Sequence, residues 1–492
     1  MGEPDPGYPD PMDRSAAHVD LYQLTSLIPH VRAGHAEDRI VLAFFSRKLP
    51  TDPTTGERAR DYVLWAGLQR CLDYLQTARF TARDLEILRA HPVLGPALRS
   101  TPEAVDRLAS WRFAGTVWSP PEGTALRFAP APRPDGTPLA IDGVHPTAGC
   151  PYLLVETDLV SAKLIETPLL STINHMCMVA TKASEVVAAA RALGPERDVL
   201  EFGQRRTNID AAVDAALAAY IGGCASTSNV AAHVRFGLPV AGTMDHFAVQ
   251  AWERPDQPRH VSERAYFEAF HALYPERDIL LVDTYDTFGA HTGIRAAVAA
   301  TRGRGPWGIR IDSALTVENL RRARRLLDDL GATRTKIFIS GGLDEDRIRD
   351  LADAPVDGYG VGERIVTAPD APVGVGAIGK VSEVRGESTM KLSRGSGKAT
   401  LPGRLQCWRT AEGDIVGLFD ERHAGEPLLR LAWDPRDGRL RAPAWSEVRE
   451  HARRSIAGLP PLKSEGPDLR VTPRLERLVQ TLVRRDLETQ NS

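Results

Sequence analysis

The stretch WGIRIDSALTVENLRRARRLLDDLGATRTKIFISGG, residues 307–342, contains two apolar runs separated by one amphipathic helix pattern. Thr316 is a suitable N-cap, and Gly331 stands where a C′ glycine ends a helix. Apolar residues recur between them at the spacing of one helix face: Leu320, Ala323, Leu327 and Leu330. The runs GIRI and KIFIS have the length and composition of buried strands, so this order predicts a parallel βα unit.

The same alternation extends to both sides of this unit, from residue 198 to about residue 367. The apolar runs that predict strands are, in chain order, VLEFG, YIGG, LPVAG, ILLVD, GIRID, KIFIS and DGYGVG. Helical patterns separate most of them, which is typical of an α/β protein with a parallel sheet. We interpret the sheet as an irregular βα barrel, and an open doubly wound sheet stays as the alternative because it has the same periodicity.

The residues outside this core have other patterns. Residues 20–99 are predominantly helical in pattern, and TARDLEIL resembles a capping box. GTALRFAP and TPLAIDG predict short strands, as do PGRLQCWR, DIVGLFD and PLLRLAW after residue 388. We therefore predict a disordered tail at 1–17 and a barrel at 166–386. The discontinuous α+β flanking domain comprises 18–165 and 387–492.

The composition excludes several classes of function. The 61 basic and 64 acidic residues nearly cancel, which disfavours nucleic acid or a membrane surface as a partner but allows a local anion-binding pocket. The five cysteines are scattered and form no CxxC pair, which fits a reducing cytoplasm. No apolar run approaches the ~20 residues that span a bilayer, and the acidic, proline-containing start does not resemble a signal peptide.

Polar or glycine residues follow nearly every predicted strand. In a βα barrel the active site lies at the carboxyl ends of the strands and in the loops after them, so these residues are the candidates. They are Arg205, Arg206, Thr227, Ser228, Thr243, His246, Asp283, Arg310, Asp312, Ser340, Gly341, Gly342, Gly360 and Gly362.

The chemistry of these candidates favours an anionic ligand. Two glycine-containing turns, SGG and GVG, follow consecutive strands and offer backbone N–H groups to a phosphate. Arg205 and Arg206 suit a carboxylate or phosphate, and the alternative for one of them is a structural salt bridge. Asp312 is interpreted as a carboxylate for a cation or a hydroxyl group, whereas Asp283 fits that role and a helix cap equally.

Taken in order, these blocks resemble the nicotinate phosphoribosyltransferase family. The matching segments run from about residue 20 to 410: DLYQLT, FFSRKLP, ETPLLSTIN, VLEFGQRR, AYIGG with TSNV, GLPVAGTMDH, LLVDTYDT, GIRIDS, LDE after ISGG, GVGERIVT and KATLPGRLQCWR. The resemblance implies a type II phosphoribosyltransferase-like barrel that transfers the phosphoribosyl group of phosphoribosyl pyrophosphate to nicotinate. It also implies Mg²⁺, coupled ATP hydrolysis and a homodimer with active sites at the subunit interface.

The resemblance also assigns roles. His246 of the GT-x-x-H block is the residue that ATP phosphorylates, which favours a reactive over a structural histidine. Asp312 binds ribose hydroxyls and is a weak candidate for Mg²⁺, and Tyr22 reaches the site of a neighbouring subunit. Three arginines hold pyrophosphate and the nicotinate carboxylate: Arg205, Arg206 and Arg310. Three glycines surround the 5′-phosphate: Gly341, Gly342 and Gly362.

Some positions differ from the family pattern. Asp245 and Phe247 flank His246 where GTMAHS is usual, DSGD is replaced by DSAL at 312–315, and Glu363 follows GVG. Two alternatives therefore stay open beside nicotinate transfer. One is a phosphoribosyltransferase with another acceptor, such as nicotinamide or a different pyridine acid, and the other is a non-catalytic nucleotide-binding paralogue.

Overall fold

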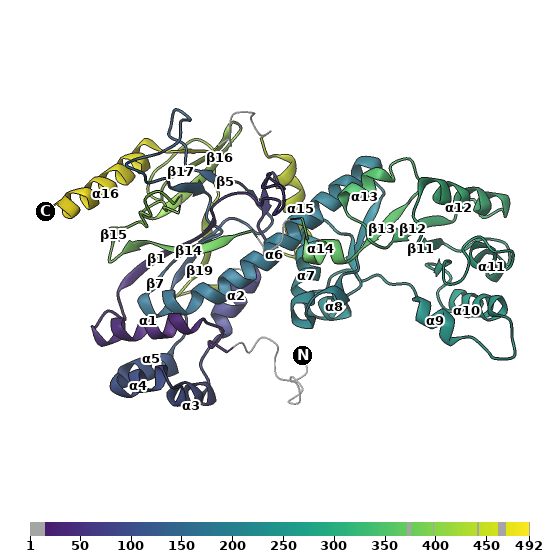
Figure 1. Cartoon of the computed structure of the whole chain (residues 1–492), viewed down its shortest axis with the longest axis horizontal. Helices are drawn as coiled ribbons and strands as arrows, with labels where there is room; N and C mark the ends of the chain where they lie inside the picture. The colour runs from purple at the N-terminus through teal and green to yellow at the C-terminus, as the bar shows by residue number, and fades with distance from the viewer. Residues whose placement is uncertain (1–14, 371–374, 397, 440–441, 461–468, 492) are drawn as a thin grey trace. The chain divides into compact units, whose positions relative to one another are not determined.

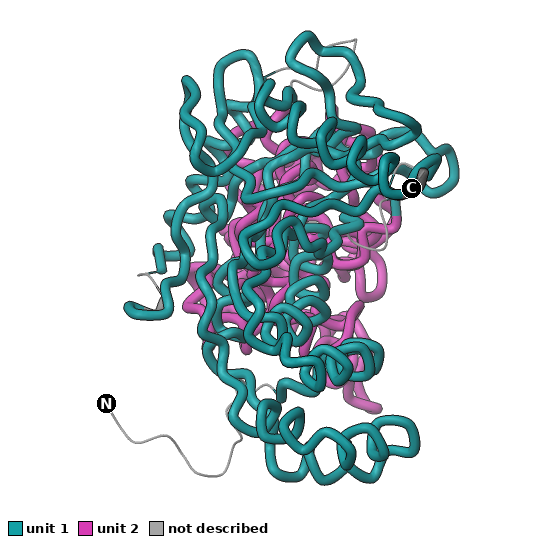
Figure 2. Tube along the Cα trace, turned by 90° about the vertical axis from the view of Figure 1, so that its left-hand side faces the viewer, with its two compact units in different colours: residues 1–178, 370–492 teal, residues 179–369 magenta. Residues whose placement is uncertain are grey.

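The computed structural model describes residues 15–370, 375–396, 398–439, 442–460 and 469–491. They form two compact units, residues 1–178 with 370–492 and residues 179–369, which Figure 2 colours separately. The first boundary falls within the long helix α6 (Leu159–Leu193). Residues 1–14, most of the predicted disordered tail, lie outside the described residues.

The first unit is built on a seven-stranded sheet that joins strands from both ends of the chain (Figure 1). Its order is β15-β14-β1-β7-β3-β19-β20, and its pairs are antiparallel. The strands are β1 (Arg39–Ser46), β3 (Thr116–Ser119), β7 (Leu153–Asp158), β14 (Ala377–Val384), β15 (Glu387–Ser388), β19 (Arg430–Asp434) and β20 (Gly438–Arg439). The prediction of a helical pattern throughout residues 20–99 is wrong at β1, whose apolar run is buried between β14 and β7.

The unit also contains two two-stranded sheets, one of β2 (Val63–Leu64) with β4 (Ala125–Leu126) and one of β5 (Phe128–Pro130) with β6 (Thr147–Gly149). A second, four-stranded sheet and several helices complete the unit. The sheet has the order β18-β16-β17-β21, with strands β16 (Leu405–Thr410), β17 (Gly413–Leu418), β18 (Glu426–Pro427) and β21 (Leu469–Val471). The helices are α1 (Leu21–Arg32), α2 (Leu68–Thr77), α3 (Ala82–Ala90), α4 (Leu94–Ser100), α5 (Pro102–Ser110), α15 (Trp445–Ala457) and α16 (Pro473–Asn491). Thr81 and Asp84 form the predicted capping box at the start of α3.

The second unit contains a six-stranded parallel sheet of order β10-β11-β12-β13-β8-β9. Its strands are β8 (Asp198–Glu201), β9 (Ser226–Thr227), β10 (Ile279–Leu281), β11 (Gly308–Ile311), β12 (Lys336–Ser340) and β13 (Gly358–Val361). The last strand pairs with the first, which is the neighbour relation of a βα barrel. Because the ladder ends at β9 and β10 among the described strands, the sheet is a partial barrel within an α/β fold.

The helices of this unit follow the strands as βα units require. They are η1 (Gln204–Arg206), α7 (Ile209–Ile221), α8 (Val230–Phe236), α9 (His246–Ala251), α10 (Arg259–Leu273), α11 (Gly293–Ala300), α12 (Val317–Asp329), α13 (Glu345–Asp350) and α14 (Glu363–Thr367). Thr316 caps α12 through the Asn319 N–H, and Gly331 after the helix has a φ of +79°. Within the part of the chain that the structure describes, no helix is both long and apolar enough to cross a membrane.

Two predicted strands of this unit are wrong. YIGG contains the last turn of α7, and the strand comes later, at β9. LPVAG contributes only the isolated bridge between Thr227 and Val240. Both runs are apolar and short, so their periodicity did not distinguish a helix end or a loop from a strand.

Candidate functional site

A pocket of about 520 Å³ lies at the carboxyl ends of the parallel strands in the second unit. Three of the predicted residues line it, Arg205, Ser228 and Arg310. The other lining residues are Phe202, Gln204, Thr207, Ile209, Gly242, Met244 and Asp245. The pocket therefore brings together three of the predicted residues, two of them arginines, with Asp245 also in its lining.

Arg310 projects from β11 into this pocket. Its Nη2 donates to the Met244 carbonyl oxygen at 2.8 Å, whereas its buried Nε has no hydrogen-bond partner among the described residues. Burial lowers the pKa of the guanidinium, and Asp312 and Asp283 act in the opposite direction. A guanidinium stays charged in proteins, so the pocket presents a partly desolvated positive charge to an anion.

Arg205 and Arg206 point to different partners although they are adjacent in η1. Arg205 lines the pocket, and its charge contributes to lowering the pKa of Arg310. The Nε of Arg206 lies 3.6 Å from Oε2 of Glu363, and both side chains are more than half exposed. Arg205 is thus the member of the pair available to a ligand in the pocket.

Two aspartates at the ends of neighbouring strands form a hydrogen-bonded network. Oδ2 of Asp283 accepts the N–H of Asp312 at 2.9 Å and the hydroxyl of Ser313 at 2.6 Å. Asp312 in turn accepts a hydrogen bond from the Ser340 hydroxyl. Oδ1 of Asp283 is buried without a hydrogen-bond partner among the described residues. An unpaired buried carboxylate oxygen is costly unless a cation or donor satisfies it, so Asp283 belongs to the candidate site rather than to a helix cap.

His246 is the first residue of α9, and its neighbours fix its orientation. Its Nδ1 lies 3.1 Å from the Thr284 hydroxyl. Asp245 is the N-cap of the same helix, where Oδ1 accepts the Ala248 N–H at 2.9 Å. The aspartate that departs from the family pattern therefore has a structural function next to the histidine. Thr243, two residues earlier, donates to the Met244 carbonyl at 3.4 Å.

The two glycine turns disfavour residues with a side chain, either because the backbone φ is positive or because a Cβ would collide with neighbouring atoms. Gly341 has a φ of +100°, and a Cβ there would lie 2.4 Å from the Asp312 carbonyl oxygen. Gly342 has a φ of +66°. A Cβ on Gly360 would lie 2.5 Å from the Phe202 ring, and one on Gly362 would lie 2.9 Å from the Phe202 carbonyl oxygen. The first turn thus adjoins Asp312, and the second adjoins the loop that carries Arg205.

Glu201 is a functional candidate that the sequence reasoning missed. It ends β8 almost fully buried, where it accepts the backbone N–H of Gly203 and the Thr227 hydroxyl, the latter at 2.6 Å. Thr227 also accepts the Asn229 N–H at 3.0 Å, so both of these strand ends are tied together. Burial raises the pKa of the Glu201 carboxyl, and the two hydrogen bonds oppose this shift. The sequence signal that could have identified Glu201 is its position as a charged residue inside the apolar run VLEFG.

Tyr22 lies in the first unit, in a group of charged residues. Its ring is half exposed, and Lys163 Nζ lies 5.6 Å from the ring centroid. Gln23 donates through Nε2 to the Tyr22 hydroxyl at 3.1 Å and to Glu166 Oε2 at 2.7 Å. Lys380 lies 3.7 Å from the other oxygen of Glu166. Tyr22 is therefore an accessible ring held beside Lys163, and its hydroxyl is linked through Gln23 to Glu166.

A preassembled metal centre is not part of this arrangement. No three His, Cys, Asp or Glu side chains of the described residues gather into a group that could hold a metal ion. Magnesium commonly takes one or two carboxylates and completes its shell with waters and substrate phosphates. The unpaired oxygen of Asp283 next to Asp312 is compatible with that mode of binding.

Comparison with known proteins adds the following relationships. Residues 18–174 match the family described as the nicotinate phosphoribosyltransferase (NAPRTase) N-terminal domain. A nicotinate phosphoribosyltransferase of Mycobacterium tuberculosis (strain H37Rv) is 36% identical over 456 residues, covering 91% of this chain and 88% of that protein. The Bacillus subtilis (strain 168) nicotinate phosphoribosyltransferase is 32% identical over 435 residues, 85% of this chain and 79% of that protein. The crystal structure of human nicotinic acid phosphoribosyltransferase superposes with a TM-score of 0.75 at 24% identity, covering 94% of this chain and 99% of that one.

Proposed function

The chain belongs to the nicotinate phosphoribosyltransferase family, and we propose on that premise that it is the enzyme that makes nicotinate mononucleotide from nicotinate and phosphoribosyl pyrophosphate. This reaction salvages nicotinate for NAD synthesis. The observation that carries the proposal is the convergence of Arg205 and Arg310 on one pocket at the strand ends. In the same unit Asp283, Asp312 and His246 lie at the neighbouring strand ends and loops.

The reaction breaks the bond between C1 of the ribose and the pyrophosphate and forms a bond from C1 to the nicotinate ring nitrogen. Positive charge develops on the ribose as the anion leaves, so the protein must stabilise pyrophosphate and position a nitrogen that is already nucleophilic. Arg310 and Arg205 supply the positive charge, and Arg310 does so from a partly desolvated position where its field is strong. No side chain has to act as a base toward the acceptor.

We assign the remaining candidates around this centre. Asp312 binds the ribose hydroxyls. With Asp283 it would hold a Mg²⁺ ion, which when bound supplies charge neutralisation for the pyrophosphate. Ser340 orients Asp312 through its hydrogen bond. The glycine turns would accommodate the 5′-phosphate: Gly341, Gly342, Gly360 and Gly362. Thr227 ends β9, Ser228 follows it and lines the pocket, and Thr243 lies in the loop before α9.

We further propose that ATP phosphorylates His246 and that its hydrolysis is coupled to the transfer. Nδ1 faces Thr284, so the ring is held with the other nitrogen, Nε2, as the candidate phosphate acceptor. Asp245 is engaged in capping α9, and Glu363 is paired with Arg206. These two acidic residues therefore have structural explanations, which weakens the case for a non-catalytic paralogue.

The quaternary and domain arrangement is also a proposal. A closed type II phosphoribosyltransferase-like barrel over 166–386, flanked by an α+β domain of 18–165 and 387–492, would place Tyr22 of one subunit in the site of another within a homodimer. The half-exposed Tyr22 ring beside Lys163 supports this. Cytoplasmic localisation is supported by the five buried cysteines, none of which forms a disulfide.

A pyrophosphate-release assay tests the proposed reaction. The purified protein receives phosphoribosyl pyrophosphate and Mg²⁺ with nicotinate or nicotinamide, each with and without ATP. We expect release with nicotinate that increases with ATP. Release with nicotinamide alone would establish the different-acceptor alternative, and the absence of release in all four conditions would refute the proposal.

The shared site has its own test. Tyr22→Ala and His246→Ala proteins, neither of which is expected to show ATP-stimulated activity, are mixed, dissociated and reassociated, and the ATP-stimulated rate is measured. If the site uses Tyr22 from one subunit and His246 from the other, hybrid dimers contain one intact site and recover part of the activity. No recovery from verified hybrids would show that each subunit builds its site alone.

A further inference from the structure

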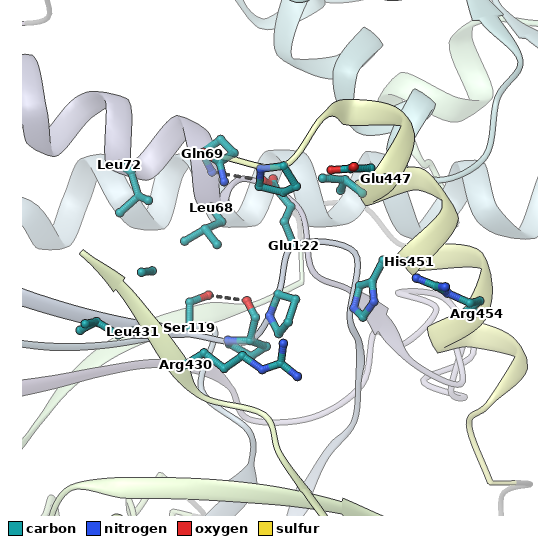
Figure 3. A pocket seen from close by; sticks show the side chains of 15 residues that line it. Leu68, Gln69, Leu72, Ser119, Glu122, Arg430, Leu431, Glu447, His451 and Arg454 are labelled. Carbon is teal, nitrogen blue, oxygen red and sulfur yellow. Dashed lines mark hydrogen bonds between the residues drawn. The ribbon is translucent and has the colours of Figure 1, made fainter. Parts of the chain in front are cut away.

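A second pocket, of about 420 Å³, lies wholly within the first unit (Figure 3). It is formed by the start of α2, the segment after β3, the strand β19 and the helix α15. Its lining residues are Leu68, Gln69, Leu72, Ser119, Pro120, Pro121, Glu122, Arg430, Leu431, Ala432, Pro443, Glu447, Val448, His451 and Arg454. The reaction proposed above does not use any of these residues.

The two ends of this pocket differ in chemistry. Figure 3 shows Leu68, Leu72 and Leu431 on one side, and His451 and Arg454 on the other. The guanidinium of Arg430 extends toward the His451 side. Leu431 remains 40% exposed although it is a large apolar residue. The pocket is therefore amphipathic, with an uncovered apolar wall opposite a group of cationic side chains.

The two carboxylates in the lining accept hydrogen bonds from backbone N–H groups. Buried Glu122 accepts the backbone N–H of Gly67 at 2.6 Å and that of Gln69 at 3.2 Å, at the start of α2. Glu447 accepts the Ala444 N–H at 3.0 Å at the start of α15. Both carboxylates therefore serve backbone donors at helix N-termini, where negative charge is favourable.

The arginines keep most of their binding capacity. The side chain of Arg454 makes no ion pair and no hydrogen bond among the described residues, and its backbone carbonyl accepts the Gly458 N–H at the end of α15. Arg430 in β19 pairs with Glu426 in β18, four residues earlier in the sequence, but both side chains are more than half exposed. An exposed pair of this kind contributes little and exchanges readily with another anion. Two guanidinium groups can thus turn toward one oxyanion.

His451 also lines the pocket, and its two ring nitrogens have different environments. The Thr124 hydroxyl donates to the Pro121 carbonyl at 2.6 Å, so the Nε2–H of His451 must be the donor in its 3.1 Å contact with Thr124. Nδ1 then has no partner among the described residues. Burial, and after it Arg454, lowers the pKa of His451; Arg430 and Arg409 act in the same direction, and Glu426 opposes them. The ring therefore presents Nδ1 as a polar atom in the same pocket as Arg430 and Arg454.

We propose that this pocket binds a small organic oxyanion with an apolar body. The carboxylate or phosphate would contact Arg430 and Arg454, and the body would cover Leu68, Leu72 and Leu431. The volume lies in the range of small-molecule sites, which are typically ~300–1,000 Å³ and mostly apolar with a few polar groups. The apolar wall explains why a free inorganic anion would not satisfy the site.

Calorimetric titration of the full-length protein tests this proposal. Saturating nicotinate is present throughout, so that the proposed acceptor position of the catalytic site is occupied, and no turnover is required. The probes are 1-naphthoate, 1-naphthyl phosphate, the neutral 1-naphthalenemethanol and inorganic phosphate. We expect one of the two naphthyl oxyanions to bind at least tenfold more tightly than the alcohol and than inorganic phosphate. Which of them binds distinguishes a carboxylate from a phosphate ligand.

Variants locate the binding in this pocket. We expect Arg454→Gln and Arg430→Gln each to weaken the preferred oxyanion about tenfold, because a charge-assisted hydrogen bond is lost. Arg453→Gln is the matched control, since Arg453 lies on the same helix, is exposed and pairs with Glu450 outside the pocket. Leu431→Glu should abolish binding.

Three results would overturn the proposal. They are the absence of binding by both naphthyl oxyanions, equal binding by the neutral alcohol, and an affinity that Arg454→Gln and Arg430→Gln leave unchanged. Because the readout is binding, the proposed transferase activity can fail while this site is present, and the reverse also holds.

Discussion

Arg206 lies with its Nε 3.6 Å from Oε2 of Glu363, while Arg205 beside it lines the pocket with Arg310. Two arginines that are adjacent in the sequence therefore have different environments: Arg206 forms a surface ion pair, and Arg205 lines the candidate site. We expect Arg205→Gln to reduce kcat/KM for phosphoribosyl pyrophosphate by about 10- to 100-fold, the effect of losing one charge-assisted hydrogen bond. Steady-state kinetics of the pyrophosphate release measure it.

Arg206→Gln is the matched control for this prediction. An exposed ion pair contributes little, so we expect a change of less than about threefold in kcat/KM and no measurable change in thermal stability. Equal losses in both variants would show that Glu363 does not divert Arg206 from the substrate.

The contact between Nδ1 of His246 and the Thr284 hydroxyl predicts that substitutions of these two residues reduce the stimulation by ATP to different extents. His246→Ala should leave the fold intact, because the half-buried ring adds little to the core, and should remove the stimulation by ATP. Thr284→Val keeps the shape but removes the hydroxyl, so we expect a partial loss of stimulation. Initial rates with and without ATP, together with phosphate trapped on the protein, measure both effects. Full ATP stimulation in His246→Ala would contradict the phosphohistidine role.

The strand-end rule located three of the ten residues that line the pocket. The pattern of apolar runs placed Arg205, Ser228 and Arg310 at one edge of a parallel sheet, and the structure brings them to one pocket. The rule works because the carboxyl ends of parallel strands share an edge, so local patterns are sufficient to predict which residues meet. It succeeded even where the strands themselves were misplaced, as at YIGG and LPVAG.

Features that depend on distant partners could not be predicted in this way. The capping role of Asp245 is local, but the burial of Glu201 and the pairing of Arg206 with Glu363 depend on tertiary contacts. The same is true of β1, whose continuous apolar run fits a buried helix as well as a central strand until its neighbours β7 and β14 are known. The apolar periodicity of a segment predicts which of its residues are buried, but it does not predict which other helices or strands bury them.

Ala314, two residues after Asp312, predicts a gain in stability on substitution. Its φ is +49°, a left-handed conformation that costs a residue with a Cβ about 1–2 kcal/mol, and its position corresponds to the glycine of the family's DSGD. We expect Ala314→Gly to raise the free energy of unfolding by about 0.5–1 kcal/mol after the greater chain entropy of glycine is subtracted. Denaturant unfolding measures it. Ala352→Gly is the control, because this exposed loop alanine has no positive φ, and it should lower the free energy of unfolding. If Ala314→Gly also lowered the free energy of unfolding, no backbone strain would be stored at Ala314.

Glu263 on α10 predicts a pH-dependent stability. It is fully buried, Oε2 accepts the Gly293 N–H at 3.0 Å, and Oε1 has no hydrogen-bond partner among the described residues. Burial raises the pKa of this carboxyl from 4.5 to about 7, so between these values the folded protein binds a proton that the unfolded chain does not. Stability therefore falls as pH rises from 4.5 to 7, by about 2–3 kcal/mol for this group, and is constant above 7.

Glu263→Gln keeps the shape and an acceptor for Gly293 but removes the titration. We compare the free energy of unfolding of the variant with that of the native protein at each pH. This difference should favour the variant by roughly 2 kcal/mol more at pH 8 than at pH 5, because only the native side chain must be buried as an anion at pH 8. Denaturant unfolding at both pH values measures this difference. Glu268→Gln on the same helix is the control, since that carboxylate is exposed and paired with Arg264, and its effect should not depend on pH. The same relative stability of Glu263→Gln at pH 5 and pH 8 would show that Glu263 does not titrate in this range, and that the buried carboxylate finds a compensating partner in the folded protein.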